Sequence, residues 1–133
     1  MKARLSQQPE NRLYVWLPQE QREELFDKLE RVCRRCYLSL YEIRQEMLDS
    51  PITTWMEKGP DPSAQKGAPL PEPMLLFCGV SSSLLGKALQ VMQQEQIPRI
   101  PHKAVLTEHN RQWTPRQLYG ELSREDQAVR GKG

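Results

Sequence analysis

Two cysteines separated by two residues are the first feature of the chain that could do chemistry. Cys33 and Cys36 flank a pair of arginines, and thiols at this spacing serve in disulfide exchange, where nearby cations favour the thiolate. The sequence places both at the end of a predicted helix, where the helix dipole opposes an anion. We therefore interpret them as buried core thiols, and keep a thiol or metal protein using Cys33 and Cys36 as an alternative.

A glycine- and serine-rich run follows the most apolar segment of the chain. Residues 79–87, GVSSSLLGK, lie between a predicted strand and a predicted helix, which is where phosphate-binding loops occur. The spacing is too long for a P-loop, and the run lacks the last glycine of a nucleophile elbow. We interpret the three serines, Ser81 to Ser83, as helix-capping residues.

The remaining candidates for chemistry are two histidines and a third cysteine. His102, His109 and Cys78 do not stand at metal-ligand spacing from the cysteine pair. The sequence identifies no catalytic partner for either histidine, so we interpret both as surface groups. The sequence thus indicates no catalytic residue, no metal site and no cofactor. We favour a non-enzymatic protein and keep an enzyme as the second hypothesis.

Composition narrows the classes of partner. The 133 residues carry a net charge of +2, which fits one domain and is weak for a nucleic-acid-binding protein. Arg99, Lys103, Arg111 and Arg116 could still form a basic face beside Trp113, so a nucleic-acid-binding accessory protein stays as an alternative. Because the sequence shows neither a membrane span nor a signal peptide, and three cysteines cannot all pair, we expect a cytoplasmic protein.

A proline-rich segment divides the chain. Residues 58–73 contain five prolines and two glycines, a composition that excludes helix and sheet ladder, and we predict a flexible linker there. Residues 1–57 form the N-terminal half, residues 74–127 the C-terminal half, and residues 128–133 a flexible tail. Each half shows the order strand, helix, strand, helix. This order predicts an α/β fold with a small, mainly parallel sheet and helices packed on it.

The N-terminal half begins with a strand and a helix. Residues 13–17 are β-prone, and Pro18 suits the first turn of the helix that follows. A brief helical turn follows Pro51 and ends at Gly59. The first helix is predicted from an apolar stripe with helical spacing, formed by Leu25, Phe26, Leu29, Val32 and Cys33.

Two alternatives compete for the segment after that helix. The apolar stripe could continue as one helix from Gln19 to Asp49, or it could break. Ser39 and Glu42 fit a capping box, which favours a new helix near Leu40 and a short strand over residues 34–38. We favour the break.

The C-terminal half has the clearer signals. Residues 74–80, MLLFCGV, predict a buried strand, and residues 103–107 predict a second one. Between them lies a helix that starts at the serine caps. The last helix has Thr114 at its N-cap, Pro115 at its first position and Gln117 completing a capping box.

This half resembles a bacterial family, Domain of Unknown Function 3783. The shared pattern is I-P-x-I-P-x-K-A-V-L-T-x-x-N-x-x-W-T, followed by a helix that closes with L-x-x-E-L. His102 stands at a position that is apolar in the pattern. The pattern falls on Ile97, Pro98, Ile100, Pro101, residues 103–107, Asn110, Trp113, Thr114 and residues 118–122.

The resemblance implies no known activity, but its signature is polar. We therefore expect an uncharacterised binding or interaction module whose site lies at the end of the 103–107 strand and in the following loop. The partner would be a protein or a small anionic ligand, and the oligomeric state stays open. A structural role is the alternative, since Asn110 could equally cap the backbone of the loop. The site residues are Lys103, Thr107, Asn110, Arg111 and Trp113.

Overall fold

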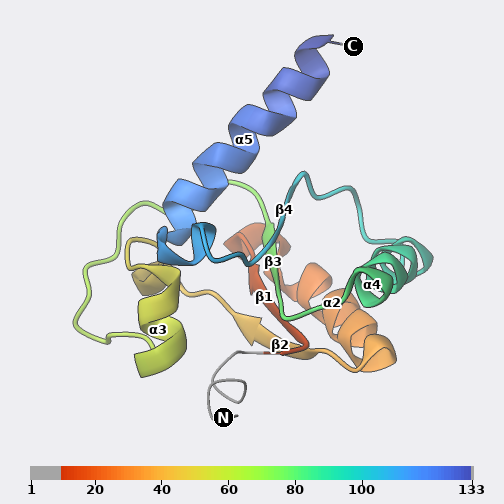
Figure 1. Cartoon of the computed structure of the whole chain (residues 1–133), viewed down its shortest axis with the longest axis horizontal. Helices are drawn as coiled ribbons and strands as arrows, with labels where there is room; N and C mark the ends of the chain where they lie inside the picture. The colour runs from red at the N-terminus through yellow and green to blue at the C-terminus, as the bar shows by residue number, and fades with distance from the viewer. Residues whose placement is uncertain (1–9, 133) are drawn as a thin grey trace.

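The computed structural model describes residues 10–132 of the chain (Figure 1). Strands and helices alternate, as the sequence predicts, and three short 3-10 helices join them. The strands are β1 (Arg12–Trp16), β2 (Ser39–Glu42), β3 (Met74–Cys78) and β4 (His102–Val105). The helices are η1 (Gln19–Gln21), α2 (Arg22–Cys36), η2 (Gln45–Met47), α3 (Ile52–Lys58), α4 (Ser82–Gln94), η3 (Asn110–Gln112) and α5 (Pro115–Lys132).

All four strands form one sheet in the order β2-β1-β3-β4. β1 is parallel to β2, and β3 is parallel to β4, so the predicted small, mainly parallel α/β sheet is confirmed. The two halves meet in the middle, where β1 and β3 pair antiparallel over five residues, from Arg12 opposite Cys78 to Trp16 opposite Met74. The halves therefore share one sheet.

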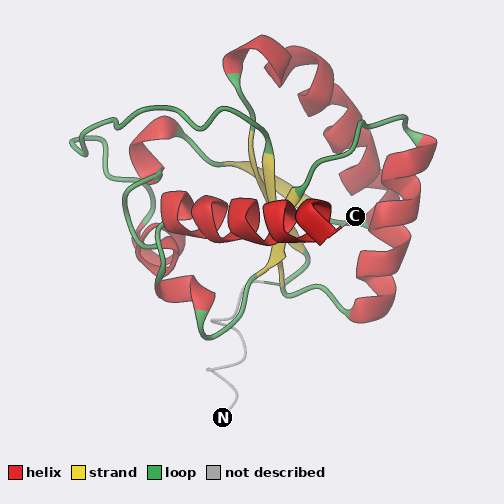
Figure 2. Ribbon diagram, turned by 90° about the horizontal axis from the view of Figure 1, so that it is seen from above, coloured by secondary structure: helices red, strands yellow, loops and turns green. Residues whose placement is uncertain are grey.

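Helices cover both faces of this sheet (Figure 2). Side chains alternate along each strand, so Leu13 and Phe77 point towards α2 and α4, whereas Tyr14 and Leu76 point towards α3 and α5. Each face carries a buried apolar cluster with residues from both halves. Burial on both faces explains why β1 and β3 are apolar along their whole length.

Apart from η1, which is present in the N-terminal half alone, the two halves have the same series of elements: strand, helix, strand, 3-10 helix, helix. The first helix of each half also ends in the same way, with a left-handed residue, Tyr37 at φ 59° and Gln96 at φ 62°. In each case the next backbone N–H bonds back five residues, from Leu38 to Cys33 O and from Ile97 to Met92 O. The repetition is structural, and it turns the chain from helix to strand at both places.

The second strand of the N-terminal half lies later than the sequence predicts. α2 continues through Cys36, and Ser39–Glu42, predicted as a helix start, is strand β2. The reason is non-local, because the edge of β1 supplies backbone partners: the Ser39 N–H bonds to Asn11 O and the Ile43 N–H to Val15 O. The predicted capping box and the alternative of one long helix are both wrong. The helical turn ending at Gly59 is confirmed as α3.

The predicted helix starts of the C-terminal half are confirmed. The Ser81 hydroxyl accepts the Leu84 N–H at the start of α4. At the start of α5 the Thr114 N–H bonds to the Gln117 side chain at 2.9 Å, and the Gln117 N–H bonds back to the Thr114 hydroxyl at 3.1 Å. This reciprocal capping box fixes the direction in which α5 leaves the loop.

Beyond Lys58, the last residue of α3, the proline-rich segment forms neither helix nor strand, but it is held against the body of the fold. Leu70 is buried, and its carbonyl accepts the Trp16 indole N–H at 3.1 Å. Gln45 and Arg116 bind the carbonyls of Gly67 and Ala68. The segment is therefore a wall of the fold as well as a connection.

Helix α5 runs to Lys132, so residues 128–132 continue the helix instead of forming the tail that the sequence predicts. Its C-terminal part extends away from the rest of the fold (Figure 1). Residue 133, the last of the predicted tail, lies outside the described residues. No helix within residues 10–132 is long and apolar enough to span a membrane.

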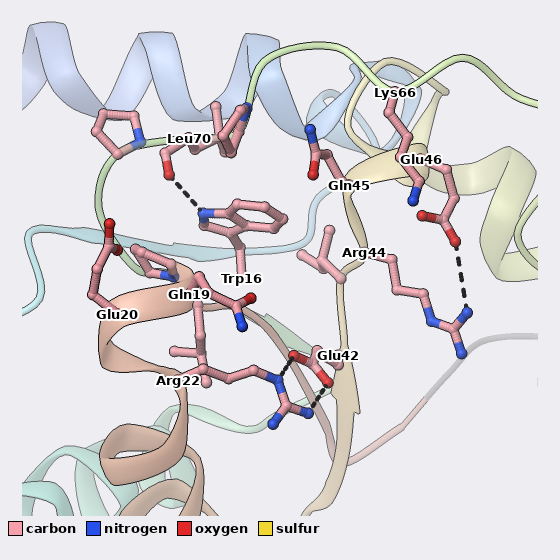
Figure 3. A pocket seen from close by; sticks show the side chains of 15 residues that line it. Trp16, Gln19, Glu20, Arg22, Glu42, Arg44, Gln45, Glu46, Lys66 and Leu70 are labelled. Atoms are coloured by element: carbon pink, nitrogen blue, oxygen red, sulfur yellow. Dashed lines mark hydrogen bonds and ion pairs between the residues drawn. The ribbon is translucent and has the colours of Figure 1, made fainter.

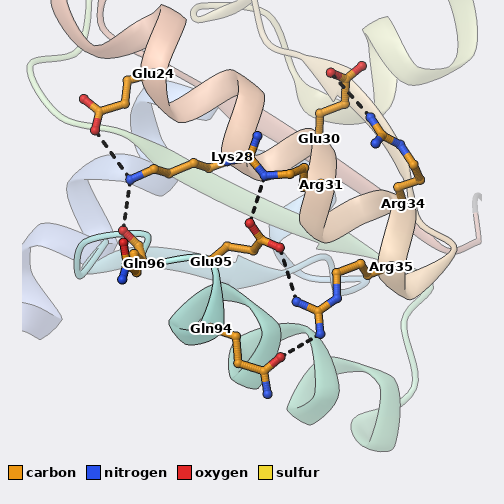
Figure 4. Close-up of polar contacts among 9 residues, drawn as sticks. All are labelled: Glu24, Lys28, Glu30, Arg31, Arg34, Arg35, Gln94, Glu95 and Gln96. Carbon is orange, nitrogen blue, oxygen red and sulfur yellow. Dashed lines mark hydrogen bonds and ion pairs between the residues drawn. The ribbon is translucent and has the colours of Figure 1, made fainter.

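A polar cluster ties α2 to the end of α4 (Figure 4). Arg31 and Arg35 both contact the Glu95 carboxylate, at 2.9 and 3.2 Å, and Arg31 is the larger cause of the lowered pKa of Glu95. Lys28 donates to the Gln96 carbonyl. These contacts occupy much of the positive charge on the exposed side of α2.

Candidate functional site

The structure separates Lys103 from the other predicted site residues. Lys103 lies near the start of β4, and its ammonium donates to the Ile100 carbonyl, on the side away from the loop. Burial, followed by the charge of Arg99, lowers the pKa of Lys103. Thr107 and Asn110 follow the other end of the strand. The predicted cluster of Lys103 and Asn110 is therefore not formed.

Thr107 and Asn110 hold their own loop together. The Thr107 N–H donates to the Asn110 side-chain oxygen at 2.8 Å, and the Asn110 N–H donates to the Thr107 hydroxyl at 3.0 Å. The Asn110 amide also donates to the Val105 carbonyl at 3.0 Å. Each functional group of Asn110 thus has a partner inside the loop, which is the structural alternative that the sequence left open.

Arg111 and Trp113 attach this loop to α3. The Arg111 guanidinium donates to the Thr53 hydroxyl at 3.1 Å and lies 3.8 Å from the Glu57 carboxylate. Trp113 is half-buried against the α3 and α5 cluster, and its carbonyl accepts the Ile52 N–H. Both residues have a structural role, and ligand binding by the Lys103 to Trp113 region stays a prediction.

The proposed basic face is neutralised by neighbouring acids. Arg99 pairs with Asp126 at 2.8 Å, and Arg116 binds both oxygens of Asp49, whose pKa it lowers. Arg111 lies within 4 Å of two glutamates. Because these cations already have acidic partners, they give little support to the nucleic-acid alternative.

The cysteines lie in the core. Cys33 and Cys36 are buried on α2, and Cys78 is buried on β3. Burial raises the pKa of the Cys33 thiol, and that of the Cys78 thiol, to about 12. Thiols that stay protonated and out of contact with solvent are poor nucleophiles. Within the described residues, His, Cys, Asp and Glu side chains form no group of three that could hold a metal.

His102 is buried, contrary to the prediction that it is a surface group. Its ring stacks on Tyr119, with centroids 4.0 Å apart, and Nε2 lies 2.9 Å from the Ser123 hydroxyl. Nδ1 has no hydrogen-bond partner among the described residues and lies 3.6 Å from a Glu72 carboxylate oxygen. This burial explains why the family pattern has an apolar residue at the position of His102.

Serine, histidine and carboxylate are the residue types of a nucleophilic triad, but this cluster lacks a necessary part. Ser123 lies inside α5, where backbone N–H groups bond to carbonyls of the preceding turn and are not free to stabilise an oxyanion. The Nδ1 to Glu72 separation also exceeds a hydrogen bond. We interpret the cluster as the contact that fixes α5 on β4.

This contact predicts a pH dependence of stability. Burial is the largest cause of the lowered pKa of His102, and the charges of Glu72 and Asp126 oppose it. The unfolded chain therefore takes up a proton at a higher pH than the folded protein. The contribution of His102 to the free energy of unfolding should be fully present above about pH 6.5 and should decrease as the pH falls below that value.

The measurement is urea unfolding between neutral and mildly acidic pH, for the wild type and for His102→Leu. The variant lacks the titrating group, so its free energy of unfolding should decrease less than that of the wild type as the pH is lowered. Ser123→Ala is the control, because it removes the hydrogen bond but keeps the imidazole, and should retain the wild-type slope. Parallel curves for the wild type and His102→Leu would show that the histidine is not responsible.

A pocket that the sequence did not indicate lies at the carboxyl ends of β1 and β2 (Figure 3). Its volume is about 640 Å³. After β1 the chain continues into α2 on one face of the sheet, and after β2 it continues towards α3 on the other face. Divergence of the chain after two adjacent parallel strands leaves a crevice, which is where open α/β sheets bind ligands.

Three segments form the walls of this β1/β2 pocket. The first is the end of β1 with η1, the second is the end of β2 with η2, and the third is the proline-rich segment. The hydrogen bonds from Trp16 to Leu70 and from Gln45 to Gly67 join the third wall to the other two. The lining residues are Trp16, Leu17, Pro18, Gln19, Glu20, Arg22, residues 42–46, Lys66, Pro69, Leu70 and Pro71.

The lining charges are balanced. Arg22 binds both oxygens of Glu42 at 2.7 Å, and this contact raises the pKa of Arg22. Arg44 lies 3.6 Å from Glu46. Lys66 and Glu20 lack an ion-pair partner among the side chains that the structure describes, and they lie on opposite sides of the Trp16 indole (Figure 3).

One sequence signal could have found this pocket. The rule that ligands bind at the carboxyl ends of strands holds for the first predicted strand pair as well as for the second. Applied to the first pair, it would have pointed to the residues after Trp16. The sequence predicts the second strand too early, however, and predicts a linker where the structure has the proline-rich wall, so it does not indicate two of the three walls.

Comparison with known proteins adds a family. Residues 73–129 match the model of a family described as Domain of unknown function (DUF3783). The resemblance predicted from the sequence is thereby confirmed. Neither a curated protein nor a solved structure matches the chain. All residues that line the β1/β2 pocket precede the matched segment.

Proposed function

Since residues 73–129 belong to the DUF3783 family, whose description names no activity, we propose a function from the geometry of the site. The protein is a binding module, and its β1/β2 pocket takes a small zwitterionic molecule, for which a dipeptide is the simplest example. The binding module expected from the sequence is kept, and its site moves from the end of β4 to the carboxyl ends of β1 and β2.

The pocket position is the observation on which this proposal depends. The volume of about 640 Å³ lies within the range of small-ligand sites. Trp16, Leu70 and the prolines offer apolar surface, whereas Gln19 and Gln45 offer amide groups. Such a mixture suits a ligand with a short apolar body and polar ends.

The charges favour a zwitterion over a simple anion. Two of the three basic groups are already paired with carboxylates inside the pocket, so a ligand with only negative charge gains little there. Lys66 and Glu20 are exposed and lie on opposite sides of Trp16 (Figure 3). A carboxylate near Lys66 and an ammonium near Glu20 would complete two ion pairs at once.

The experiment is a calorimetric titration with zwitterionic dipeptides and with the same dipeptides blocked by acetylation or amidation. Exposed ion pairs contribute about 0.2–1 kcal/mol each, so Lys66→Gln and Glu20→Gln should each weaken binding by about 1.5- to 5-fold. Lys66→Gln should not affect binding of amidated peptides, and Glu20→Gln should not affect binding of acetylated ones.

Lys58→Gln is the matched control, because Lys58 is an exposed lysine at the end of α3 and does not line the pocket. It should bind the dipeptides as the wild type does. Equal affinity for free and doubly blocked dipeptides would contradict the zwitterion, and no binding of any dipeptide would contradict the proposed ligand class altogether. Inorganic phosphate bound as tightly would favour a simple anion instead.

The cellular setting belongs to the same proposal. Three unpaired, buried thiols fit a reducing compartment, and we place the protein in the cytoplasm. A protein partner or small anionic ligand at the Lys103 to Trp113 region stays a prediction. An NMR titration that follows the Trp16 and Trp113 indole groups distinguishes the two sites.

A further inference from the structure

The outer side of the edge strand β4 is closed by its own chain. Leu106 donates its N–H to Phe77 O on β3, so the alternate residues Lys103 and Val105 turn their backbone groups outward. The outward Lys103 N–H bonds to Pro101 O. The outward Val105 carbonyl accepts the Asn110 side-chain amide. These bonds occupy groups to which another strand would otherwise bind.

The other edge strand, β2, lacks such protection. Ser39 and Ile43 donate their N–H groups towards β1, so Leu40 and Glu42 turn their N–H and carbonyl groups away from the sheet. Within residues 10–132, no strand lies beyond β2. The strand contains neither proline nor lysine, and its one charge, Glu42, is neutralised by Arg22. An open edge of this kind is a template for strand pairing.

Exposed aromatic residues mark the same edge. Tyr37, two residues before β2, is 86% exposed and adopts a left-handed φ of 59°, which is uncommon for a bulky residue. Tyr41, within β2, is 42% exposed and stacks on Tyr14 with centroids 5.1 Å apart. Arg44 follows the strand, with its side chain 67% exposed. The strand thus has an aromatic residue before it and a cation after it.

The outward backbone groups of β2 are self-complementary in an antiparallel pair. With Tyr41 of both chains on a two-fold axis, Leu40 lies opposite the partner's Glu42, and each such pair can exchange two backbone hydrogen bonds. The two Tyr41 side chains come together on one face. The same register sets Tyr37 opposite the partner's Gln45 and Arg44 opposite the partner's Leu38.

We propose that the protein forms a two-fold dimer through antiparallel β2 to β2 pairing, which extends the four strands into a continuous eight-stranded sheet. The occupant of the open edge is thus a second copy of this chain. Because Gln45 lines the β1/β2 pocket and lies opposite the partner's Tyr37 in this register, the partner's Tyr37 would border the pocket entrance. The dimer is independent of the identity of the ligand, and either proposal can fail alone.

The experiment is sedimentation equilibrium of the full chain over a range of protein concentrations. The wild type should show a concentration-dependent dimer. Leu40→Pro removes one outward N–H that the fold does not use, and should be monomeric. Leu40→Ala is the matched control, because it shortens the same side chain but keeps the N–H, and should still dimerise.

Several results would overturn the proposal. A wild type that is monomeric at every concentration would show that a second copy of the chain does not occupy the β2 edge. Dimerisation of Leu40→Pro, or equal loss in Leu40→Ala, would show that backbone pairing at β2 is not the contact. If Leu40→Pro does not fold, amide exchange of the wild type decides: the Leu40 and Glu42 amides must exchange more slowly in concentrated than in dilute protein, and unchanged rates overturn the dimer.

Discussion

Phe77→Ala is expected to lower the free energy of unfolding by about 3–5 kcal/mol. Phe77 is 1% exposed on the central strand β3, where it pairs with Leu13 of β1 and Val105 of β4. Its ring belongs to the apolar cluster beneath α2 and α4, to which both halves contribute. Truncation removes buried apolar surface and leaves a cavity between elements that cannot easily close.

Urea unfolding, followed by circular dichroism, measures this loss as a shift of the transition midpoint at unchanged slope. Leu89→Ala is the control, because Leu89 lies on α4 but is 37% exposed, and should cost less than about 1 kcal/mol. A loss at Phe77 as small as that at Leu89 would mean that the core beneath α2 and α4 is not packed as described.

Separation of the two halves should abolish folding of both. Residues 1–58 expressed alone would expose β1 along its β3 edge, and residues 59–133 would expose β3 in the same way. Each buried cluster would also lose the side chains that the other half supplies. Neither fragment could then bury enough apolar surface to offset its conformational entropy.

Thermal and urea unfolding of each purified fragment measures this outcome, and neither should give a cooperative transition. The matched control is the full protein cleaved between Ser63 and Ala64, which are in the proline-rich segment away from its contacts with Trp16 and Gln45. This cleaved protein should stay folded as a two-chain complex. A cooperative transition in either isolated fragment would make that half an independent domain.

Local signals predicted the C-terminal half well. Thr114 and Gln117 bond to each other within one turn, and the Ser81 hydroxyl accepts the N–H of Leu84, three residues along the chain. Both partners of such a short-range interaction lie close together in the sequence, so the starts of α4 and α5 can be located from the sequence. The apolar run at β3 was equally informative, because a strand buried on both faces needs no alternation.

Non-local pairing explains the error at β2. Ser39 and Glu42 have the residue types of a capping box, but β1 offers their backbone a ladder of hydrogen bonds. A partner that lies more than 20 residues away in the sequence leaves no local mark on Ser39–Glu42. Tertiary context therefore overrides a local helix signal at this point.

The sequence attributes the polar family motif to binding, whereas the structure gives it a role in closing the loop and the outer edge of β4. Asn110 and Thr107 bond to each other, and Asn110 also covers the outer Val105 carbonyl of β4. A loop that must close a sheet edge needs polar side chains for that purpose alone. The β1/β2 pocket was missed because its walls come from three distant segments.

Two-dimensional NMR of the indole N–H groups shows whether the ligand binds in the β1/β2 pocket. The chain has three tryptophans: Trp16 in the β1/β2 pocket, Trp113 in the loop after β4, and Trp55 buried on α3. Titration with a zwitterionic dipeptide should shift the Trp16 indole resonance, whose N–H bonds to Leu70 O, and leave the other two in place. A shift of Trp113 with Trp16 unmoved would contradict the account and place the site at the end of β4.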